Sequence, residues 1–344
     1  MLKIVEIASI ASADERWQAY HRLMAHLKKE FGSLYQMHNG EELKKSVLSF
    51  IAREQNYDRV LICENDRLVG WADTKVFNAG TPDELLSIRF DSVYDIFPVE
   101  LSRVLAQYFY RGLLKYNIPH LFFISQDKRL IQIALGWGGR KMHRNDEYVL
   151  YRKRANIALM KSWLEEIPAR NPDLKLRFFP ETLEEYFEPF ARVLSRCLND
   201  MPQEGDDHIT FLVSVEDLKG QVAWRRENGI PSYKYVLFDQ RNEIIGLTMV
   251  EMRAKYPQEA SQAMTGVLES YRGRGLAKWL KAAMFFKVGE DFPENVKITT
   301  MMRAVNLPMQ HINLKMGYVL EREGMEMKVT GVSLAGFLNY KTGE

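Results

Sequence analysis

The chain has 344 residues, of which 46% are apolar, so it exceeds the usual size of one domain and can bury two hydrophobic cores. Its 47 lysines and arginines balance 45 acidic residues, and the net charge of +2 does not favour nucleic acid as a partner. The two cysteines, Cys63 and Cys197, are too few for a disulfide framework, and no apolar run is long enough to cross a membrane. Because the first residues are also too charged for a signal peptide, we expect a soluble, cytoplasmic protein of two domains with no membrane partner.

The first half of the chain predicts a mixture of strands and helices. Residues 59–76 contain two apolar runs around a polar turn, which is typical of a β-hairpin. Residues 14–31 show helical spacing, since Trp17, Tyr20 and Leu27 fall on one face. The other predicted elements are a strand at 2–8, a helix at 41–54, a strand at 86–94, a helix at 98–116, a strand at 120–125, a helix at 128–135 and a strand at 146–152.

The second half repeats this order of elements. It begins with a strand at 174–179, helices at 181–198 and 215–228, and a hairpin at 233–253. Gly70 and Gly246 occupy equivalent points of the two hairpins, 176 residues apart, and Gly136 and Gly317 are 181 residues apart. The near-constant offset predicts an internal duplication.

The stretch Thr265–Leu280 carries the clearest functional pattern. A short apolar run ends in the turn Arg272–Gly275, and apolar residues then recur at helical spacing, which predicts a strand, a glycine turn and a helix. Gly273 and Gly275 let the backbone approach a ligand, and the first helical N–H groups have no intrahelical partner, so the turn suits an anion. A solvated hairpin turn is the alternative. A dinucleotide fold is disfavoured because Lys278 stands where a third Gly or Ala belongs.

The pattern Arg272-x-x-Gly275-x-Ala277 resembles the pyrophosphate loop of the GNAT superfamily of acyl-CoA transferases. After a predicted strand at 296–301, the segment Asn306–Tyr318 resembles the family's helix behind the fifth strand, ending in a Gly-aromatic step. Over most of its length the chain is similar to tandem GNAT proteins of the mycothiol synthase type. The resemblance implies a mixed α/β fold of two tandem GNAT domains, with acetyl-CoA as co-substrate and no metal.

The two predicted domains are residues 1–155 and 172–344, joined by a helical linker at 156–171. They differ where the resemblance places the coenzyme. The first domain has Asp95-Ile-Phe-Pro98 in place of the glycine turn, and Pro98 lacks a backbone N–H. We therefore expect a degenerate first domain that does not bind coenzyme A and either is structural or walls the substrate cleft.

The resemblance also implies which residues hold acetyl-CoA. The backbone N–H groups of Val267 and Leu268 are expected to donate to the acyl oxygen. Asn306 is expected to contact the pantetheine arm, or else to cap a turn. The 3′-phosphate is assigned to Arg274, Lys278 and Lys281, which could equally form a solvated helix face. The diphosphate is assigned to Arg272, Gly273, Arg274, Gly275, Leu276 and Ala277.

The catalytic groups are defined less sharply. A protonated amine needs a base, and the position that relatives use for it holds Ser261 here. Glu259, on the same strand face, is the first substitute and Glu251 the second, although either also suits a surface charge. Asn313 stands where many relatives carry a tyrosine that protonates the departing thiolate. A thiol with a pKa of roughly 8.5 can leave with only a hydrogen bond. The histidines show no metal-binding spacing.

The acidic segment 199–208 favours a cationic acceptor, or is simply a solvated loop. The resemblance implies an N-acetyltransferase, an acyltransferase that moves the acetyl group of acetyl-CoA to a primary amine of a small molecule by direct attack, working as a monomer or homodimer. The missing tyrosine and displaced carboxylate leave a non-catalytic acyl-CoA or metabolite-binding protein as the alternative. Transfer from a charged tRNA on a similar double fold is disfavoured by the near-neutral charge.

Overall fold

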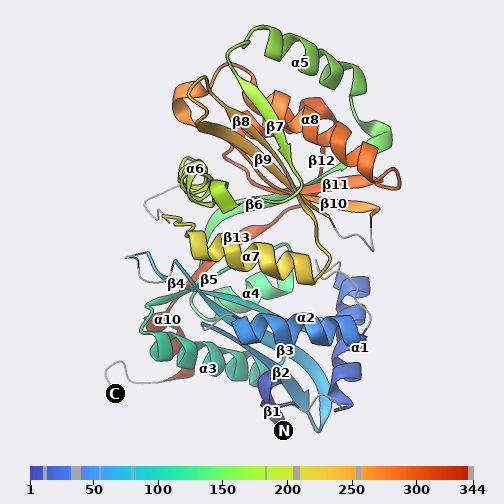
Figure 1. Cartoon of the computed structure of the whole chain (residues 1–344). Coiled ribbons are helices and arrows are strands. Elements are labelled where there is room, and N and C mark those ends of the chain that lie inside the picture. Colours follow the sequence, from blue (N-terminus) through green and yellow to red (C-terminus); the bar gives the residue numbers. More distant parts are fainter. Residues whose placement is uncertain are drawn as a thin grey trace. The chain divides into compact units, whose positions relative to one another are not determined.

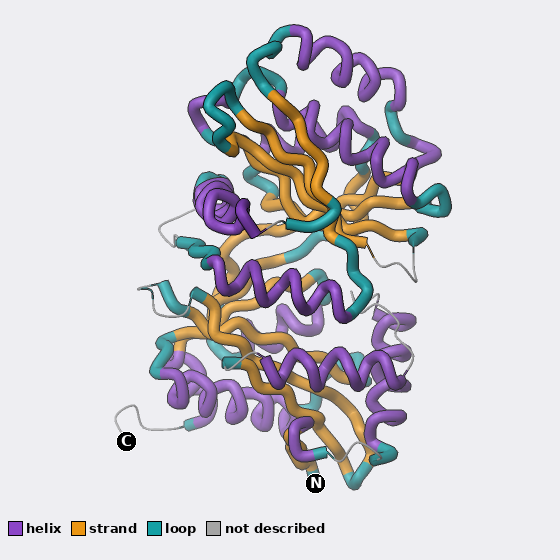
Figure 2. The backbone as a smooth tube through the Cα atoms, viewed as in Figure 1, coloured by secondary structure: helices purple, strands orange, loops and turns teal. Residues whose placement is uncertain are grey.

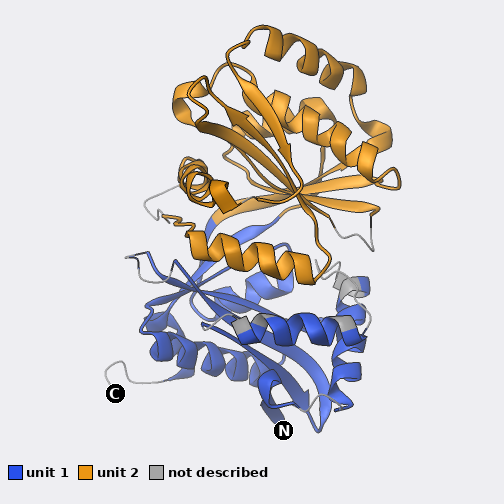
Figure 3. Ribbon diagram, in the orientation of Figure 1, with its two compact units in different colours: residues 1–142, 324–344 blue, residues 143–323 orange. Residues whose placement is uncertain are grey.

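The computed structural model describes residues 1–10, 14–31, 40–53, 56–78, 81, 83–182, 184–203, 210–252 and 257–339. The chain forms two compact units (Figure 3). Unit 1 comprises residues 1–142 and 324–344, and unit 2 comprises residues 143–323. Each unit is a mixed sheet with helices packed against it (Figure 2).

Unit 1 has the strand order β1-β2-β3-β4-β5-β13, in which β4 and β5 run parallel and the other neighbours antiparallel. Its elements are β1 (Leu2–Glu6), a 3-10 turn (Ile7–Ser9), α1 (Arg16–Phe31), α2 (Gly40–Arg53), β2 (Tyr57–Glu64), β3 (Arg67–Phe77), β4 (Leu85–Ser92), α3 (Val99–Tyr116), β5 (His120–Ser125), α4 (Lys128–Gly136), β13 (Met325–Thr330) and α10 (Gly331–Leu338).

Alternating side chains of the unit 1 strands fill two separate cores. On β3, Trp71 joins the core under α1 with Trp17, whereas its neighbour Ala72 joins the other core with Phe109 of α3. This follows from the two-residue period of a strand, which sends successive side chains to opposite faces. In Figure 1, α10 lies beside α3, and Leu334 of α10 is buried in the same core as Phe109.

Unit 2 has the strand order β6-β11-β10-β9-β8-β7, with β12 also paired to β6, and its parallel neighbours are β10 and β11. Its elements are β6 (Arg140–Tyr151), a 3-10 turn (Arg152–Arg154), α5 (Ile157–Ala169), β7 (Lys175–Phe179), a 3-10 turn (Glu184–Tyr186), α6 (Phe187–Asn199), α7 (Val215–Glu227), β8 (Ser232–Phe238), β9 (Ile244–Met252), β10 (Glu259–Val267), a 3-10 turn (Glu269–Tyr271), α8 (Leu276–Asp291), β11 (Lys297–Arg303), α9 (Leu307–Met316) and β12 (Val319–Arg322).

Unit 2 also buries apolar residues on both faces of its sheet. On β8, Leu237 belongs to the core under α5 and α8, and Phe238 to the core under α6 and α7. α7 begins with a capping box, in which Ser214 and Asp217 each accept a hydrogen bond from the other's backbone N–H. α9 ends at Gly317, whose φ of 102° is the left-handed conformation that glycine adopts without strain.

The boundaries of the units differ from the expected division at 155 and 172. The strand predicted at 146–152 does not close the sheet of unit 1, because β6 pairs with β11 and β12 of unit 2. The expected linker is α5, whose Met160 and Trp163 are buried in the core of unit 2. After unit 2, the chain returns to unit 1 as β13, which pairs with β5. The two halves have thus exchanged their final strands.

The duplication is visible in matching backbone contacts. Gly70 faces Ser92 at the end of β4, and Gly246 faces Val267 at the end of β10. An added Cβ would lie 2.8 Å from the carbonyl of Asp91 in the first case and 3.0 Å from that of Gly266 in the second. The expected equivalence of Gly136 and Gly317 is shifted, because the glycine with positive φ after α4 is Gly138.

In the described part of the chain, no helix is long and apolar enough to cross a membrane. The same residues contain no group of three or more histidine, cysteine, aspartate or glutamate side chains placed to hold a metal ion.

Candidate functional site

The candidate site of unit 2 forms where two parallel strands separate. β10 and β11 are paired only between Glu259–Ser261 and Lys297–Thr299. Beyond this point β10 remains paired with β9 and carries a bulge between Gln262 and Met264. The amide Nε2 of buried Gln262 donates to the hydroxyl of Thr248 at 2.8 Å and to two backbone carbonyls, which fixes the bulge.

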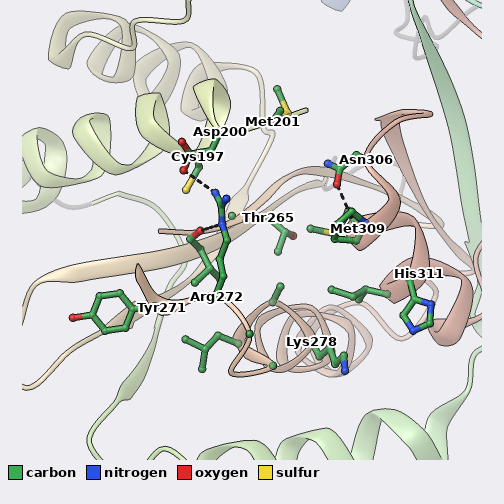
Figure 4. Close-up of a pocket in the computed structure, with 18 of the residues that line it drawn as sticks. Cys197, Asp200, Met201, Thr265, Tyr271, Arg272, Lys278, Asn306, Met309 and His311 are labelled. Atoms are coloured by element: carbon green, nitrogen blue, oxygen red, sulfur yellow. Dashed lines mark hydrogen bonds and ion pairs between the residues drawn. The ribbon is translucent and has the colours of Figure 1, made fainter. Parts of the chain in front are cut away.

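A pocket of about 490 Å³ lies beside the separated end of β10 (Figure 4). Its walls come from the end of α6, the end of β10, the glycine turn, and the first turns of α8 and α9. The lining residues named in the sequence analysis are Val267, Arg272, Gly273, Gly275, Leu276, Ala277, Lys278 and Asn306. The strand end, glycine turn and helix start expected from the sequence therefore lie around this pocket.

The turn before α8 presents backbone N–H groups to the pocket. Gly273 and Gly275 have φ angles of 79° and 82°, which residues with a Cβ rarely adopt. Hydrogen bonding of the helix begins at Lys278, whose N–H donates to the carbonyl of Gly275 at 2.9 Å. Within the described residues, the N–H groups from Gly273 to Ala277 have no hydrogen-bond partner. Five donors at the positive end of α8 are therefore available to an anion.

The end of β10 presents a second set of backbone groups. The N–H of Leu268 donates to the carbonyl of Ile245 on β9 at 2.9 Å, so it is not available to an acyl oxygen, contrary to the expectation. The same bond makes Val267 and Gly246 a non-hydrogen-bonded pair, so the N–H and carbonyl of Val267 point away from β9. By the same alternation, those of Thr265 do so too. The backbone N–H groups of Val267 and Thr265 thus lie at the edge of β10 that β11 leaves unpaired, and we call them the strand-edge donors.

Arg272 already occupies one of these strand-edge groups. Its Nε donates to the carbonyl of Val267 at 3.1 Å, and its Nη2 forms an ion pair with Oδ2 of Asp200 at 2.7 Å (Figure 4). Asp200 is the residue that ends α6, and it is the one carboxylate among the described residues that line the pocket. The ion pair is half-exposed, with 46% of the Arg272 side chain and 24% of the Asp200 side chain accessible.

The three basic residues assigned to the 3′-phosphate take different positions. Arg274 turns away from the pocket, and its Nε donates to Asn171 at 2.7 Å. Lys278 lines the pocket. Lys281 is buried, with a side chain 2% exposed and its ammonium 3.3 Å from Oε1 of Gln262, and burial lowers the pKa of Lys281 to about 7. It cannot reach a solvent-exposed phosphate.

The expected catalytic residues do not line the pocket. Glu259, at the start of β10, is exposed and forms an ion pair with Lys297 at 3.1 Å. Glu251 accepts a hydrogen bond from Arg225 at 3.2 Å and lies directly opposite Ser261 in the β9–β10 register.

Asn306 and Asn313, the two asparagines expected near the coenzyme, lie in different surroundings. Asn306 caps α9, accepting a hydrogen bond from the N–H of Met309 at 3.3 Å, and also lines the pocket. Asn313 is 1% exposed, and its Oδ1 has no partner among the described residues. The acidic residues Glu204, Asp206 and Asp207 of the expected substrate loop lie outside the described residues.

Sequence reasoning missed the contribution of α6. Cys197 lines the pocket and is packed so closely on Gly266 that an added Cβ there would lie 2.6 Å from its Sγ. Burial raises the pKa of the Cys197 thiol to about 12. Asp200 follows three residues later, on the same face of the helix. That spacing was one signal in the sequence for this wall. The acidic segment 199–208, which was expected to favour a cationic acceptor, includes Asp200, so its charge was a second signal.

In unit 1, an arginine fills the equivalent separation of strands. β4 pairs with β5 only at Leu86 and Ser87. Arg129, in the first turn of α4, donates to the carbonyls of Ser92 at 3.1 Å and Tyr94 at 2.6 Å. Its guanidinium also contacts the carboxylates of Asp91 and Asp127, at 2.9 and 2.6 Å. Ser92 of unit 1 corresponds to Val267 of unit 2, because each lies opposite the equivalent glycine, so the strand-edge carbonyl of unit 1 accepts a hydrogen bond from Arg129 of the same unit.

Two units, each with a parallel strand pair that separates beside a helix start, define the tandem GNAT fold, and comparison with solved structures confirms it. The chain is similar to a tandem GNAT protein from the clavulanic acid biosynthesis pathway, with 18% identity, a TM-score of 0.75, and coverage of 96% of this chain and 99% of that chain. At such identity, the similarity establishes the fold.

Other solved structures support the same fold. A GCN5-related N-acetyltransferase from Sphaerobacter thermophilus is 12% identical with a TM-score of 0.65, and the match covers 96% of both chains. A GCN5-related glucosamine N-acetyltransferase region of a fungal multi-domain GH3 β-N-acetylglucosaminidase is 10% identical with a TM-score of 0.62, covering 95% of this chain and 38% of that one. No family model matches the sequence, and no curated protein matches it.

Proposed function

We propose that the protein is an N-acetyltransferase that moves the acetyl group of acetyl-CoA to a primary amine of a small molecule. The observation that carries this proposal is that two sets of backbone donors line one pocket. The unpartnered N–H groups of Gly273–Ala277 suit a diphosphate, and the strand-edge N–H groups of Val267 and Thr265 suit the thioester carbonyl and the pantetheine carbonyls of acetyl-CoA. Lys278 adds a positive charge to the pocket wall.

Acetyl-CoA, when bound, supplies the thioester. The turn before α8 holds the diphosphate, and the strand-edge N–H of Val267 or Thr265 stabilises the negative charge that develops on the acyl oxygen. The acceptor ammonium first releases one proton to the solvent through a base. The neutral amine then attacks the thioester carbon, so a C–N bond forms, the C–S bond breaks, and the second amine proton passes to the departing sulfur.

Of the two expected bases, Glu251 fits this step better than Glu259. Glu251 is the cross-strand neighbour of Ser261, the position at which relatives carry the base, and side chains directly opposite each other in a sheet lie on the same face. Glu259 lies six residues before Thr265, about 20 Å along an extended strand. We therefore assign the base to Glu251, acting through water.

The test is acetyl transfer from acetyl-CoA to a panel of small primary amines, measured as free thiol released. We expect amine-dependent release that saturates with acetyl-CoA. Coenzyme A binding without turnover of any amine would instead support a non-catalytic acyl-CoA-binding protein. That second candidate is favoured by Asn313, which provides no hydroxyl proton donor where many relatives have a tyrosine.

We further propose that coenzyme A binds once per chain, in unit 2. Unit 1 has Pro98 as the cap of α3, with no glycine turn before it. Arg129, which contacts the strand-edge carbonyl of Ser92, is 13% exposed and held by two carboxylates, whereas Arg272 in unit 2 is 46% exposed and held by one. Calorimetric titration with coenzyme A should give one site per chain. Two equivalent sites would contradict the degenerate character of unit 1.

A further inference from the structure

We propose that Asp200 binds the positively charged group of the acceptor, and that coenzyme A makes Asp200 available by drawing Arg272 away from it. The inference rests on the proposed function, because it takes the N–H groups of Gly273–Ala277 as the diphosphate site. It adds a specificity-determining residue and a coupling between the two substrates that the fold itself does not imply.

The position of Asp200 places its carboxylate beside the reacting end of the pocket. Asp200 ends α6, and Cys197, one helical turn earlier, is packed against Gly266 of β10. Gly266 lies between Thr265 and Val267, the two residues with outward-facing backbone groups. α6 therefore packs on the sheet face next to the strand edge that is proposed to hold the acyl carbonyl, and Asp200, at the end of α6, lines the same pocket (Figure 4).

In the free protein, Arg272 masks both Asp200 and the strand edge. Its Nη2 is 2.7 Å from Oδ2 of Asp200, and its Nε is 3.1 Å from the carbonyl of Val267. Arg272 is also the residue directly before Gly273, so its backbone belongs to the turn that holds the diphosphate. Arg272 thus connects the glycine turn before α8 with the edge of β10 at Val267 and with Asp200 at the end of α6.

A bound diphosphate competes with Asp200 for Arg272. Guanidinium groups form bidentate hydrogen bonds to phosphate, whereas a half-exposed ion pair between single side chains is weak and readily exchanged. Without Arg272, the carboxylate of Asp200 is left without a counter-charge in a pocket that now contains a polyanion. A cationic group bound to Asp200 removes this repulsion.

The exchange predicts that acyl-CoA and a cationic acceptor bind cooperatively. Because binding free energies are linked, coenzyme A raises the affinity of Asp200 for a cation by the same factor by which the cation raises the affinity for coenzyme A. Acceptors that carry a second positive charge are therefore favoured over amines without one.

The first measurement is calorimetric titration of coenzyme A into the wild type, Asp200→Asn and Asp173→Asn. Asp173 is the matched control, because it forms a similar half-exposed pair with Arg274 at 3.2 Å but does not line the pocket. Asp200→Asn releases Arg272 and should tighten coenzyme A binding about 3-fold to 10-fold. Asp173→Asn should leave it unchanged.

The second measurement is titration of spermidine, used as a cationic probe, with and without saturating coenzyme A. In the wild type, coenzyme A should tighten spermidine binding roughly 5-fold or more, and in Asp200→Asn this coupling should vanish. Equal spermidine binding with and without the coenzyme, including no binding in either state, would overturn the proposal. So would weaker coenzyme binding by Asp200→Asn, which would mean that Asp200 merely positions Arg272. If the wild type does not bind coenzyme A at all, the proposed function itself fails.

Discussion

Replacing Lys281 with methionine should stabilise unit 2 at neutral pH. The Lys281 side chain is 2% exposed, and burial lowers its pKa from 10.5 to about 7. That difference of about 3.5 pH units corresponds to a penalty on folding of roughly 5 kcal/mol. Methionine removes the penalty but loses the 3.3 Å hydrogen bond to Gln262 and the contact with the Tyr318 ring, about 1 kcal/mol each. We expect a net gain of roughly 3 kcal/mol.

The pH dependence identifies the cause of this gain. Between about pH 7 and pH 10.5 the unfolded Lys281 binds a proton that the folded one has released, so the stability of the wild type rises with pH in this window. The advantage of the variant should therefore shrink as the pH rises. Thermal and denaturant unfolding, followed by circular dichroism at about pH 7, 8.5 and 10, measures both the stability gain of the variant and its decrease with pH.

A control variant on the same helix separates this effect from a general response to methionine. Lys287→Met removes a surface ion pair with Asp291 at 2.8 Å, and should cause a small loss of stability at every pH. If Lys281→Met is less stable than the wild type by the same amount at all three pH values, the buried ammonium is compensated, and the reasoning is refuted.

Three further predictions concern coenzyme binding, catalysis and thiol reactivity in unit 2. Gly275→Ala should weaken coenzyme A binding at least about tenfold in calorimetry, because a φ of 82° is strained for alanine and the turn would move. Gly229→Ala is the control: its φ of 62° is also strained for alanine, but it lies outside the pocket, so this variant should lose stability and keep its affinity. Glu251→Gln should lower turnover roughly 100-fold, with a loss that shrinks as the pH rises, and Glu259→Gln should keep a near-normal rate; the opposite result would exchange their roles. The thiol of Cys197, whose pKa burial raises to about 12, should react slowly with thiol reagents at neutral pH and more slowly still with coenzyme A bound, and rapid labelling of the folded protein would contradict its position in the pocket wall.

Local patterns in the sequence predicted the fold and the loop of the candidate site. The glycine turn before α8 could be identified because a positive φ beside a helix start requires glycine, and Gly273 and Gly275 are separated by one residue. The duplication was visible for a similar reason: Gly70 and Gly246 face strand-end carbonyls that leave little room for a Cβ. Such positions restrict residue type strongly, so a single sequence shows them.

The remaining features depend on packing that a single sequence does not show. Lys281 was assigned to the 3′-phosphate or to a solvated helix face, but α5 packs on α8, and Lys281 is buried together with its neighbours Leu280 and Ala282. The strand at 146–152 was predicted, yet its partner was not, because an alternating strand pattern does not identify which edge it joins. Asp200 was part of an expected acidic loop, and only the fold places it against Arg272.

The exchange of final strands between the halves affects the order in which the two units can fold during synthesis. The core of unit 1 contains Met327 and Val329 of β13 and Leu334 of α10, which follow the whole of unit 2 in the chain. Although most of unit 1 precedes unit 2, its sheet therefore stays incomplete until unit 2 has been synthesised. A nascent chain stalled after unit 2 therefore exposes an unpaired edge of β5 and an uncovered apolar face of α3, so the usual N-terminal-first order of maturation is delayed in this protein.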